Sequence, residues 1–568
     1  MRNDKQSLKT WPRRLPASIE PPATSLWDSL VVSERRYPDR TALVFLESST
    51  TYRQLKEASE RLAGRLHALG VKRGDRVLVV MQNCPQLVIA HLAIARANAV
   101  VVPVNPMNRA EELRHYITDA EARVAITTAD LAAELAIASN EADSGDGLSH
   151  LIVSHFTDAI EGDDHSGVPS QWRDWLLTQH DLPRLTRGHV CHWREAMKAQ
   201  DPLPELAVAR DDLALLPYTS GTTGLPKGCM LTHGNVMHNA VGASFWLDGT
   251  PEMVNLTVLP LFHITGLVCV MHASIYSSGT MVIMPRWDRE IAGQLITQHR
   301  VSHWTSIPTM IIDLLASPNL AAHDLSSLAY IGGGGAAMPQ AVAETLLDKF
   351  GLRFVEGYGM TESAAVTLFN PCDDPKLQCL GIPFLSVDAR IMDFESGAEL
   401  PDGEQGEIVV HGPQVFSGYW KQPDASREAL ITIDGKTFLR TGDLGYRDPD
   451  GYFFITDRLK RMINASGYKV WPAEIETLLF RHPAIQEACV ISSKDSYRGE
   501  TVKAVVVVKP AHTGIKEDEI IDWCRTQVSS YKVPRIVKFV DTLPKSASGK
   551  VMWRALQESE SRVSGHAE

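Results

Sequence analysis

The sequence predicts an α/β protein with a large N-terminal domain of layered α/β subdomains, a β-rich segment and a small α+β C-terminal domain. Three observations lead to this fold class. Between residues 55 and 127, amphipathic helical periodicity alternates with short β-branched runs, a pattern typical of parallel strands joined by helices. Residues 407–411 and 451–455 have the pattern of strands. A further alternation begins after residue 457 and continues for about 110 residues, enough for a separate core.

Each element of the first domain follows from its local pattern. Leu55, Leu62 and Leu69 recur on one face of a helix, which ends at Gly70. The other elements expected here are strands at 77–80, 99–104, 124–127, 213–216 and 328–331, and helices at 87–97 and 111–120. Residues 139–200 are rich in Asp, Gly, Ser and His, and we expect them to form a peripheral insertion of loops with one or two short helices.

The C-terminal region has its own set of elements. They are a helix at 472–481, strands at 488–492 and 502–509, and a helix at 517–528. We therefore predict two domains, residues 1–457 and 458–568.

Composition excludes several classes of protein. The chain has 568 residues, too many for one small module, and 56 Lys and Arg against 68 Asp and Glu give a net charge of −12. That balance disfavours a nucleic-acid-binding protein. Eight cysteines without a CxxC pair indicate a reducing compartment rather than a disulfide scaffold. The sequence shows neither a secretory signal nor a run of about 20 apolar residues. We expect a cytoplasmic protein, and composition leaves peripheral membrane contact and a homodimer open.

The strongest chemical signal is the segment YTSGTTGLPKG at residues 218–228, which follows a predicted strand. Its glycines let the backbone curl, so that amides and hydroxyls can face phosphate oxygens, and its lysine adds a positive charge. The residues expected to contact phosphate are Thr219, Ser220, Gly221, Thr222, Thr223, Gly224 and Lys227. The segment does not match a Walker A loop. A flexible Ser/Gly/Thr loop without a ligand is the alternative.

This loop resembles that of the adenylate-forming superfamily, which includes acyl-CoA synthetases, peptide-synthetase adenylation domains and luciferases. Four further segments resemble the family in the same order: GYGMTE at 357–362, TGDLG at 441–445, DRLK at 457–460 running on to SGYK at 466–469, and PKSASGK at 544–550. Overall, the chain looks most like bacterial medium- and long-chain fatty-acid–CoA ligases.

The resemblance implies roles around ATP. Tyr358 would stack on adenine, next to Gly359, and the base would be bordered by Gly334, Gly335 and Ala336. Asp443 would accept hydrogen bonds from the ribose, and Arg458 would contact ribose or phosphate. Glu362, assisted by Thr361, would hold Mg²⁺, and Lys550 would stabilise charge on the phosphate oxygens.

The resemblance also implies a mobile C-terminal domain that rotates about a hinge at Lys460. Gly467 would line a pantetheine tunnel, and Lys469 and Arg535 would contact CoA phosphates. The expected acyl pocket contains Thr265, Gly333, Ala365 and Val366. For His263 two interpretations stay open: a place near the reacting carboxylate, or a core position.

These roles imply an acid–thiol ligase, an AMP-forming acyl-CoA synthetase that uses ATP, Mg²⁺ and coenzyme A. It would adenylate a small-molecule carboxylic acid, release pyrophosphate, and pass the acyl group to CoA with release of AMP. A medium- to long-chain fatty acid is the expected substrate, and an aryl or short branched acid is the alternative. Outside this class the alternatives are a phosphate-releasing ATPase or kinase and a non-catalytic nucleotide-binding protein.

Overall fold

The computed structural model describes residues 10–143, 145–160, 165–219, 225–335, 337–458, 461–465, 468–495, 499–512, 514–529, 531–545 and 551–564. The chain forms two compact units, each built from two stretches of sequence. The first comprises Met1–Ala389 and Val410–Leu439, and the second Arg390–Val409 and Arg440–Glu568. None of the described helices is both long and apolar enough to cross a membrane.

One sheet of the first unit has seven strands in the order β11-β8-β4-β3-β5-β6-β7. Its strands are β3 (Arg76–Val80), β4 (Val100–Val104), β5 (Val124–Thr128), β6 (His150–Ser154), β7 (His189–His192), β8 (Leu213–Leu215) and β11 (Leu231–Thr232). All neighbouring pairs are parallel except β8 with β11, which confirms the parallel arrangement expected from helix–strand alternation.

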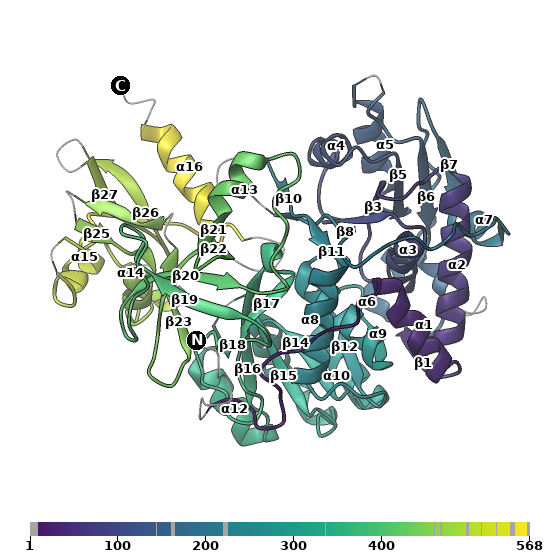
Figure 1. Ribbon diagram of the computed structural model, residues 1–568. Helices are drawn as coiled ribbons and strands as arrows, with labels where there is room; N and C mark the ends of the chain where they lie inside the picture. The colour runs from purple at the N-terminus through teal and green to yellow at the C-terminus, as the bar shows by residue number, and fades with distance from the viewer. Residues whose placement is uncertain are drawn as a thin grey trace. The chain divides into compact units, whose positions relative to one another are not determined.

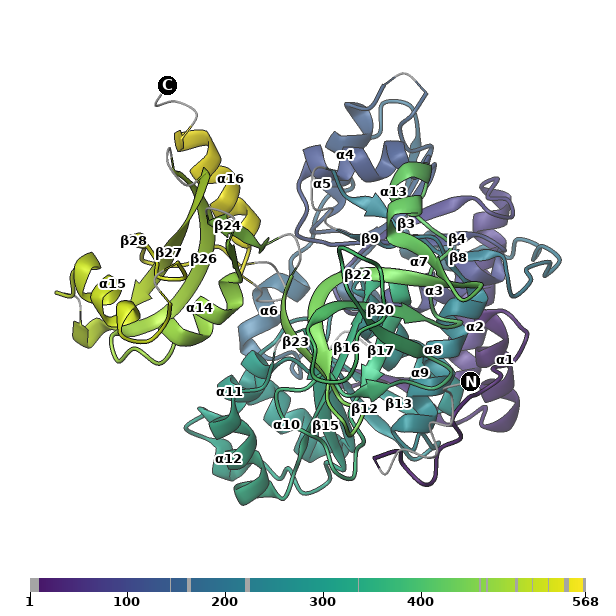
Figure 2. The same ribbon diagram turned by 60° about the vertical axis from the view of Figure 1, so that its left-hand side comes forward.

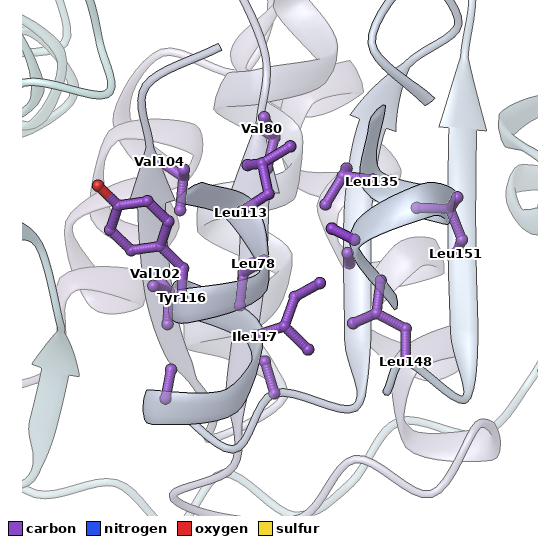
Figure 3. Packing of buried hydrophobic residues seen from close by; sticks show 14 of the residues in the cluster. Leu78, Val80, Val102, Val104, Leu113, Tyr116, Ile117, Leu135, Leu148 and Leu151 are labelled. Atoms are coloured by element: carbon purple, nitrogen blue, oxygen red, sulfur yellow. The ribbon is translucent and has the colours of Figure 1, made fainter. Parts of the chain in front are cut away.

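Helices α4 (Ala110–Asp119) and α5 (Ala132–Asn140) pack side by side against this sheet (Figure 1). Leu78 and Val80 of β3 face Leu113 and Ile117 of α4, and the cluster extends to Leu135 of α5 (Figure 3). Helix α3 (Pro85–Arg96) also packs on β3 and β4. The core of this layer therefore comes from the alternating residues of buried strands and one stripe of each helix.

The segment 139–200 departs from its prediction. It contains the expected short helices α6 (Ser170–Leu177) and α7 (Trp193–Lys198), but it also supplies strands β6 and β7 at the edge of the seven-stranded sheet. The prediction missed β6 because only its three central residues are apolar. It missed β7 because two of its four residues are histidines and none of the four is buried.

The second sheet of the first unit has nine strands in the order β18-β17-β16-β15-β14-β12-β13-β1-β2. They are β1 (Thr41–Phe45), β2 (Ser48–Thr51), β12 (Val254–Thr257), β13 (Thr280–Ile283), β14 (His303–Ser306), β15 (Tyr330–Gly334), β16 (Phe354–Met360), β17 (Ala365–Phe369) and β18 (Ile382–Pro383). The six strands from β16 to β1 in this order are parallel, and the sheet ends in antiparallel strands on both sides. The helices of this layer are α1 (Leu26–Arg36), α2 (Tyr52–Ala68), α8 (His233–Trp246), the π-helix η3 (Gly266–His272), α9 (Ala273–Ser277), α10 (Arg289–His299), α11 (Pro308–Leu315) and α12 (Gln340–Phe350).

The β-rich segment contains β19 (Asp388–Met392), β20 (Gly406–His411), β21 (Leu430–Ile433), β22 (Lys436–Arg447) and β23 (Phe453–Arg458). In the first unit β21 pairs antiparallel with the start of β22, and in the second unit the end of β22 pairs with β23. The strands expected at 407–411 and 451–455 correspond to β20 and β23.

The second unit also contains a five-stranded sheet of β25 (Tyr468–Val470), β24 (Ile463–Ala465), β27 (Gly499–Val508), β26 (Ile485–Asp495) and β28 (Ile536–Phe539). Helices α14 (Pro472–Leu479) and α15 (Glu517–Arg525) pack on one face through Ile475, Leu479 and Ile520. Helix α16 (Trp553–Ser564) covers Cys489 and Val505 on the other face (Figure 2). The α/β class, with a large and a small domain, is thus confirmed.

Candidate nucleotide-binding site

The two ends of the glycine-rich loop form a short hairpin in the first unit. Strand β9 (Tyr218–Thr219) pairs antiparallel with β10 (Lys227–Gly228), so that Lys227 lies opposite Thr219. The predicted loop residues Ser220, Gly221, Thr222, Thr223 and Gly224 lie outside the described residues. The structure therefore places the lysine and one hydroxyl of this motif beside each other.

Helix α4 supports this hairpin from one side. The Tyr218 hydroxyl donates a hydrogen bond of 2.6 Å to the Asp119 carboxylate. One turn earlier on the helix, His115 Nε2 lies 2.9 Å from the Pro226 carbonyl oxygen, which can only accept. The two ends of the predicted phosphate loop are thus held by residues four apart on one helical face.

A tight turn between β16 and β17 carries Glu362. The turn is a short 3₁₀ segment, Thr361–Ser363, and only 5% of Glu362 is exposed. Ala364 and Ala365 have φ angles of 49° and 94°, which L-residues seldom adopt. Such backbone strain persists only where the surroundings fix it, and it is concentrated at functional sites.

Asn239 of α8 holds this turn in place through its side-chain amide. Its side-chain nitrogen donates to the carbonyl oxygens of Ser363, Ala364 and Val366 at 2.9 to 3.0 Å. The amide is fully buried. One side chain therefore anchors the C-terminal end of the turn, including the strained Ala364, and sequence reasoning did not find it.

A tyrosine links the lysine of the hairpin to the glutamate of the turn. The Tyr419 hydroxyl donates a hydrogen bond of 2.7 Å to Glu362 Oε1, and Lys227 Nζ lies 5.2 Å from the centroid of the Tyr419 ring. We call these three residues the Lys227–Tyr419–Glu362 cluster. Sequence reasoning missed Tyr419, because a Gly-Tyr-Trp segment in a loop has no periodicity that sets it apart.

Burial and charge keep the groups around this carboxylate protonated. Burial first, and then the nearby Glu362 carboxylate, raise the pKa of the Tyr419 hydroxyl well above its ordinary value. The same two causes raise the pKa of the buried Cys229 thiol. At neutral pH the Tyr419 hydroxyl is therefore a hydrogen-bond donor.

The glycine run differs from its prediction, because the strand expected at 328–331 begins later and continues through the glycines. Strand β15 pairs with β16 so that Gly334 lies opposite Gly357, next to Tyr358. A Cβ atom on Gly334 would lie 2.3 Å from the Gly357 carbonyl oxygen, so the strands approach more closely than side chains permit. Gly335 then turns with a φ of +88°. Ala336 lies outside the described residues.

Most of the residues predicted to border the base and the acyl group lie on the neighbouring strands β15, β16 and β17. Strand β17 pairs with β16, so that Val366 lies opposite Gly359 and Ala365 opposite Met360. Gly333, one residue before Gly334, lies against β14: a Cβ atom there would meet the Ser306 carbonyl oxygen at 1.8 Å.

His263 and Thr265 lie between β12 and the π-helix η3. The imidazole of His263 is exposed, and its Nδ1 lies 3.4 Å from the Thr265 amide. The core interpretation of His263 is therefore wrong. Leu259 and Leu261, just before it, are held by the buried Asn83 side chain. π-helical turns are rare and frequently occur at functional sites.

In the second unit, Asp443 and Arg458 are opposite each other on β22 and β23. Asp443 is 2% exposed, and its amide donates to the Thr441 hydroxyl. The Glu407 carboxylate accepts from the Gly442 amide. Two residues expected to contact the nucleotide are thus adjacent across a strand pair.

The remaining predicted residues of this unit are only partly described. The backbone of Lys469 is in β25, and the exposed Arg535 donates its amide to Val502. Lys460, Gly467 and Lys550 lie outside the described residues. The two segments that flank residues 546–550 are joined by an isolated antiparallel β-bridge between Lys545 and Val551. The Met552 amide also donates a hydrogen bond to the Pro544 carbonyl oxygen.

The donor set around Glu362 fits a magnesium ion. Glu362 and Thr361 offer carboxylate and hydroxyl oxygens, which are the ligands that Mg²⁺ prefers. In the described part of the chain, no group of three or more His, Cys, Asp or Glu residues is arranged to hold a metal. A cation at Glu362 would thus take its other ligands from phosphate and water, as Mg²⁺ commonly does.

Comparison with known proteins identifies the family of this chain. A family model described as AMP-binding enzyme matches residues 31–420, and one described as AMP-binding enzyme C-terminal domain matches residues 474–550. A long-chain-fatty-acid–CoA ligase of Bacillus subtilis (strain 168) is 35% identical over 565 residues, 99% of this chain and 99% of that protein. A feruloyl-CoA synthase of an Amycolatopsis species is 36% identical over 521 residues, 91% of this chain and 95% of that protein. The solved structure of a Mycobacterium tuberculosis fatty acyl CoA synthetase is 27% identical, with a TM-score of 0.74 over 95% of this chain and 99% of that one. The chain therefore belongs to the AMP-binding enzyme family, as its five motifs predicted.

Proposed function

We propose that this enzyme activates a medium- to long-chain fatty acid as its adenylate and transfers the acyl group to coenzyme A in the cytoplasm. The enzyme class, an AMP-forming acyl-CoA synthetase, is confirmed by the family and its relatives. The fatty acid is our proposal. The observation that carries it is the 35% identity to a long-chain-fatty-acid–CoA ligase over 99% of both chains.

In the first step a carboxylate oxygen of the acid attacks the α-phosphorus of ATP, and pyrophosphate leaves. Negative charge grows on the phosphate oxygens, and cations fixed in place stabilise it most effectively. In the first unit Lys227 supplies one such charge. Glu362, with Thr361, would hold the magnesium ion, which neutralises phosphate charge when bound. We assign the further positive charge to Lys550.

In the second step the CoA thiol attacks the acyl-adenylate carbonyl, and AMP leaves. We propose that the C-terminal domain presents Lys550 for the first step and the segment around Gly467 for the second, turning about Lys460. A glycine at 467 would leave room for the pantetheine arm, and Lys469 and Arg535 would contact CoA phosphates. The exposed His263 would lie near the reacting carboxylate.

An aryl acid is the second candidate for the substrate. It is favoured by the 36% identity to a feruloyl-CoA synthase over 521 residues, which is as high as that to the fatty-acid ligase over a shorter span. The reaction would be the same, and only the occupant of the pocket beside Ala365 and Val366 would differ.

A panel of acids tests both candidates. The enzyme with ATP, Mg²⁺ and CoA is offered saturated acids from acetate to palmitate, together with benzoate, phenylacetate and ferulate, and AMP and pyrophosphate are measured. The highest kcat/KM for chains of eight or more carbons supports our proposal. A maximum with ferulate or benzoate selects the aryl candidate. Release of orthophosphate without AMP, whichever acid is present, contradicts both.

A further inference from the structure

Tyr419 occupies a fixed position beside the hairpin of the glycine-rich loop. The amides of Met230 and Trp420 donate to Gly418 and Gly228 at 3.0 and 2.8 Å, so residues 418–420 run along the end of β10. The Tyr419 amide donates to the Ser426 hydroxyl at 2.8 Å. The backbone therefore leaves this side chain little freedom to move.

The same segment is tied to the turn that carries Glu362. The Phe416 amide donates to the Glu362 carbonyl oxygen at 2.9 Å. The Phe416 and Tyr419 rings pack edge to face, with their centroids 4.9 Å apart. Main-chain and ring contacts thus fix the Tyr419 ring relative to the Glu362 backbone.

The Tyr419 side chain presents a different group to each of its charged neighbours. Its hydroxyl donates to Glu362 Oε1, and its ring lies 5.2 Å from the Lys227 ammonium. A hydrogen bond to a carboxylate fixes the orientation of that carboxylate, and an aromatic face attracts a cation without neutralising it. The Tyr419 side chain therefore holds the Glu362 carboxylate in place and does not neutralise the charge of Lys227.

We propose that Tyr419 is a positioning residue for adenylation, which orients the Glu362 carboxylate toward a divalent cation and the Lys227 ammonium toward the phosphates of ATP. The inference rests on the proposed function, because it assigns the cation and the phosphates to this cluster. Tyr419 acts through Glu362 and Lys227 and takes no part in bond making.

Three variants test this role. Tyr419→Phe keeps the ring and removes the hydroxyl, whereas Tyr419→Leu removes both. Tyr52→Phe is the control, because it also removes a buried hydroxyl, one that donates to the carbonyl oxygens of Ser274 and Gly279. A stability loss alone would be common to the control and the site variants.

The readouts separate metal binding from folding. Binding of Mn²⁺ is measured by electron paramagnetic resonance in the presence of α,β-methylene-ATP, and pyrophosphate–ATP exchange is measured against Mg²⁺ concentration. Thioester formation from supplied acyl-adenylate and CoA reports the second step.

Tyr419→Phe should raise the half-saturating concentrations of Mn²⁺ in binding and of Mg²⁺ in exchange about tenfold, the effect of losing a hydrogen bond to a charged group. It should change the second step less than about twofold, and Tyr419→Leu should also raise KM for ATP.

Other results would overturn the inference. Metal saturation in Tyr419→Phe equal to that of the wild type, or equal losses in both steps, would show a merely structural role. If Tyr419→Phe folds poorly, the pair Glu362→Gln and Tyr419→Phe/Glu362→Gln decides: the double variant leaves no buried charge without its donor, and it should bind Mn²⁺ no more weakly than the single one. A wild-type enzyme without acid-dependent pyrophosphate release would instead refute the proposed function.

Discussion

At Gly359 the structure has no room for a methyl group. A Cβ atom there would lie 1.4 Å from the Ala365 carbonyl oxygen and 2.9 Å from the Val366 Cα. Both contacts are with backbone, which cannot turn aside as a side chain can. The glycine therefore sets the separation of β16 and β17 beside the turn that carries Glu362.

We expect Gly359→Ala to reduce stability by about 1–3 kcal/mol, because overpacking moves the backbone. Pyrophosphate exchange should fall by more than about tenfold, the factor that 1.4 kcal/mol in the barrier represents. Urea unfolding and exchange rates measure the two effects. Gly514→Ala is the control, since a Cβ atom there meets nothing within 4 Å. Similar results for the two variants would refute the steric account.

The buried His91 of α3 predicts a pH dependence of the unfolding free energy. Neither of its ring nitrogens has a hydrogen-bond partner among the described residues, and burial, followed by the charge of His272, lowers its pKa to about 3. The unfolded chain, with a pKa near 6.5, binds a proton that the folded chain excludes. Stability contributed by the neutral form is therefore complete above pH 6.5 and is lost as the pH falls toward 3.

At pH 5 this linkage should remove about 2 kcal/mol of stability relative to pH 7.5. In His91→Leu, which places an apolar side chain at this buried position, the unfolding free energy should fall less over the same interval. Urea unfolding of both proteins at the two pH values makes the comparison. The same pH dependence in variant and wild type would show that His91 titrates normally in the folded state.

At the scale of single elements, helix α8 anchors the Glu362 turn through one residue. Replacing Asn239 with Leu leaves three buried carbonyl groups without their amide donor, and each unsatisfied polar group costs about 1–3 kcal/mol. We expect Asn239→Leu to lose at least about 2 kcal/mol of stability. Adenylation should decrease more than the second step, because the turn carries Glu362.

The control on the same helix is Phe245→Ala, because Phe245 is 45% exposed. Thermal unfolding and the two half-reactions are compared for both variants. If Asn239→Leu retained normal adenylation, α8 would not position the turn.

Helices and strands with a regular hydrophobic pattern along their length were predicted from the sequence within a few residues. Helices α2 and α4 show one apolar face, and β3, β4 and β5 are short β-branched runs. The failures share a physical reason. Glycines 332–334 extend β15, although their composition indicates a loop, because adjacent backbones require the missing side chains. Tyr419 and Asn239 act through contacts between distant segments, which local patterns do not report.

At the scale of the whole molecule, the proposed rotation of the C-terminal domain predicts opposite defects in two variants. Lys550→Ala should reduce acyl-adenylate formation by more than about a hundredfold and spare thioester formation from supplied adenylate, because its charge acts on phosphate oxygens. Gly467→Leu should spare pyrophosphate exchange and block the second step. Rapid-quench measurement of each half-reaction gives both values. Equal loss in the two steps would contradict the division of roles.

The hinge is tested separately by Lys460→Pro, since proline fixes φ near −65° and restricts the residue before it. Each half-reaction should be altered less than overall turnover, because only turnover requires the domain to alternate. Normal turnover would place the hinge elsewhere.

The interleaving of the two units has a consequence for how the protein is made. Because the first unit needs Val410–Leu439, and the second begins with Arg390–Val409, neither can be completed before the ribosome has passed residue 439. Ribosome-bound nascent chains that stop at residue 389 would lack the tyrosine that contacts Glu362. Vectorial synthesis therefore completes the Lys227–Tyr419–Glu362 cluster late, because Tyr419 is made after the lysine and the glutamate that it contacts.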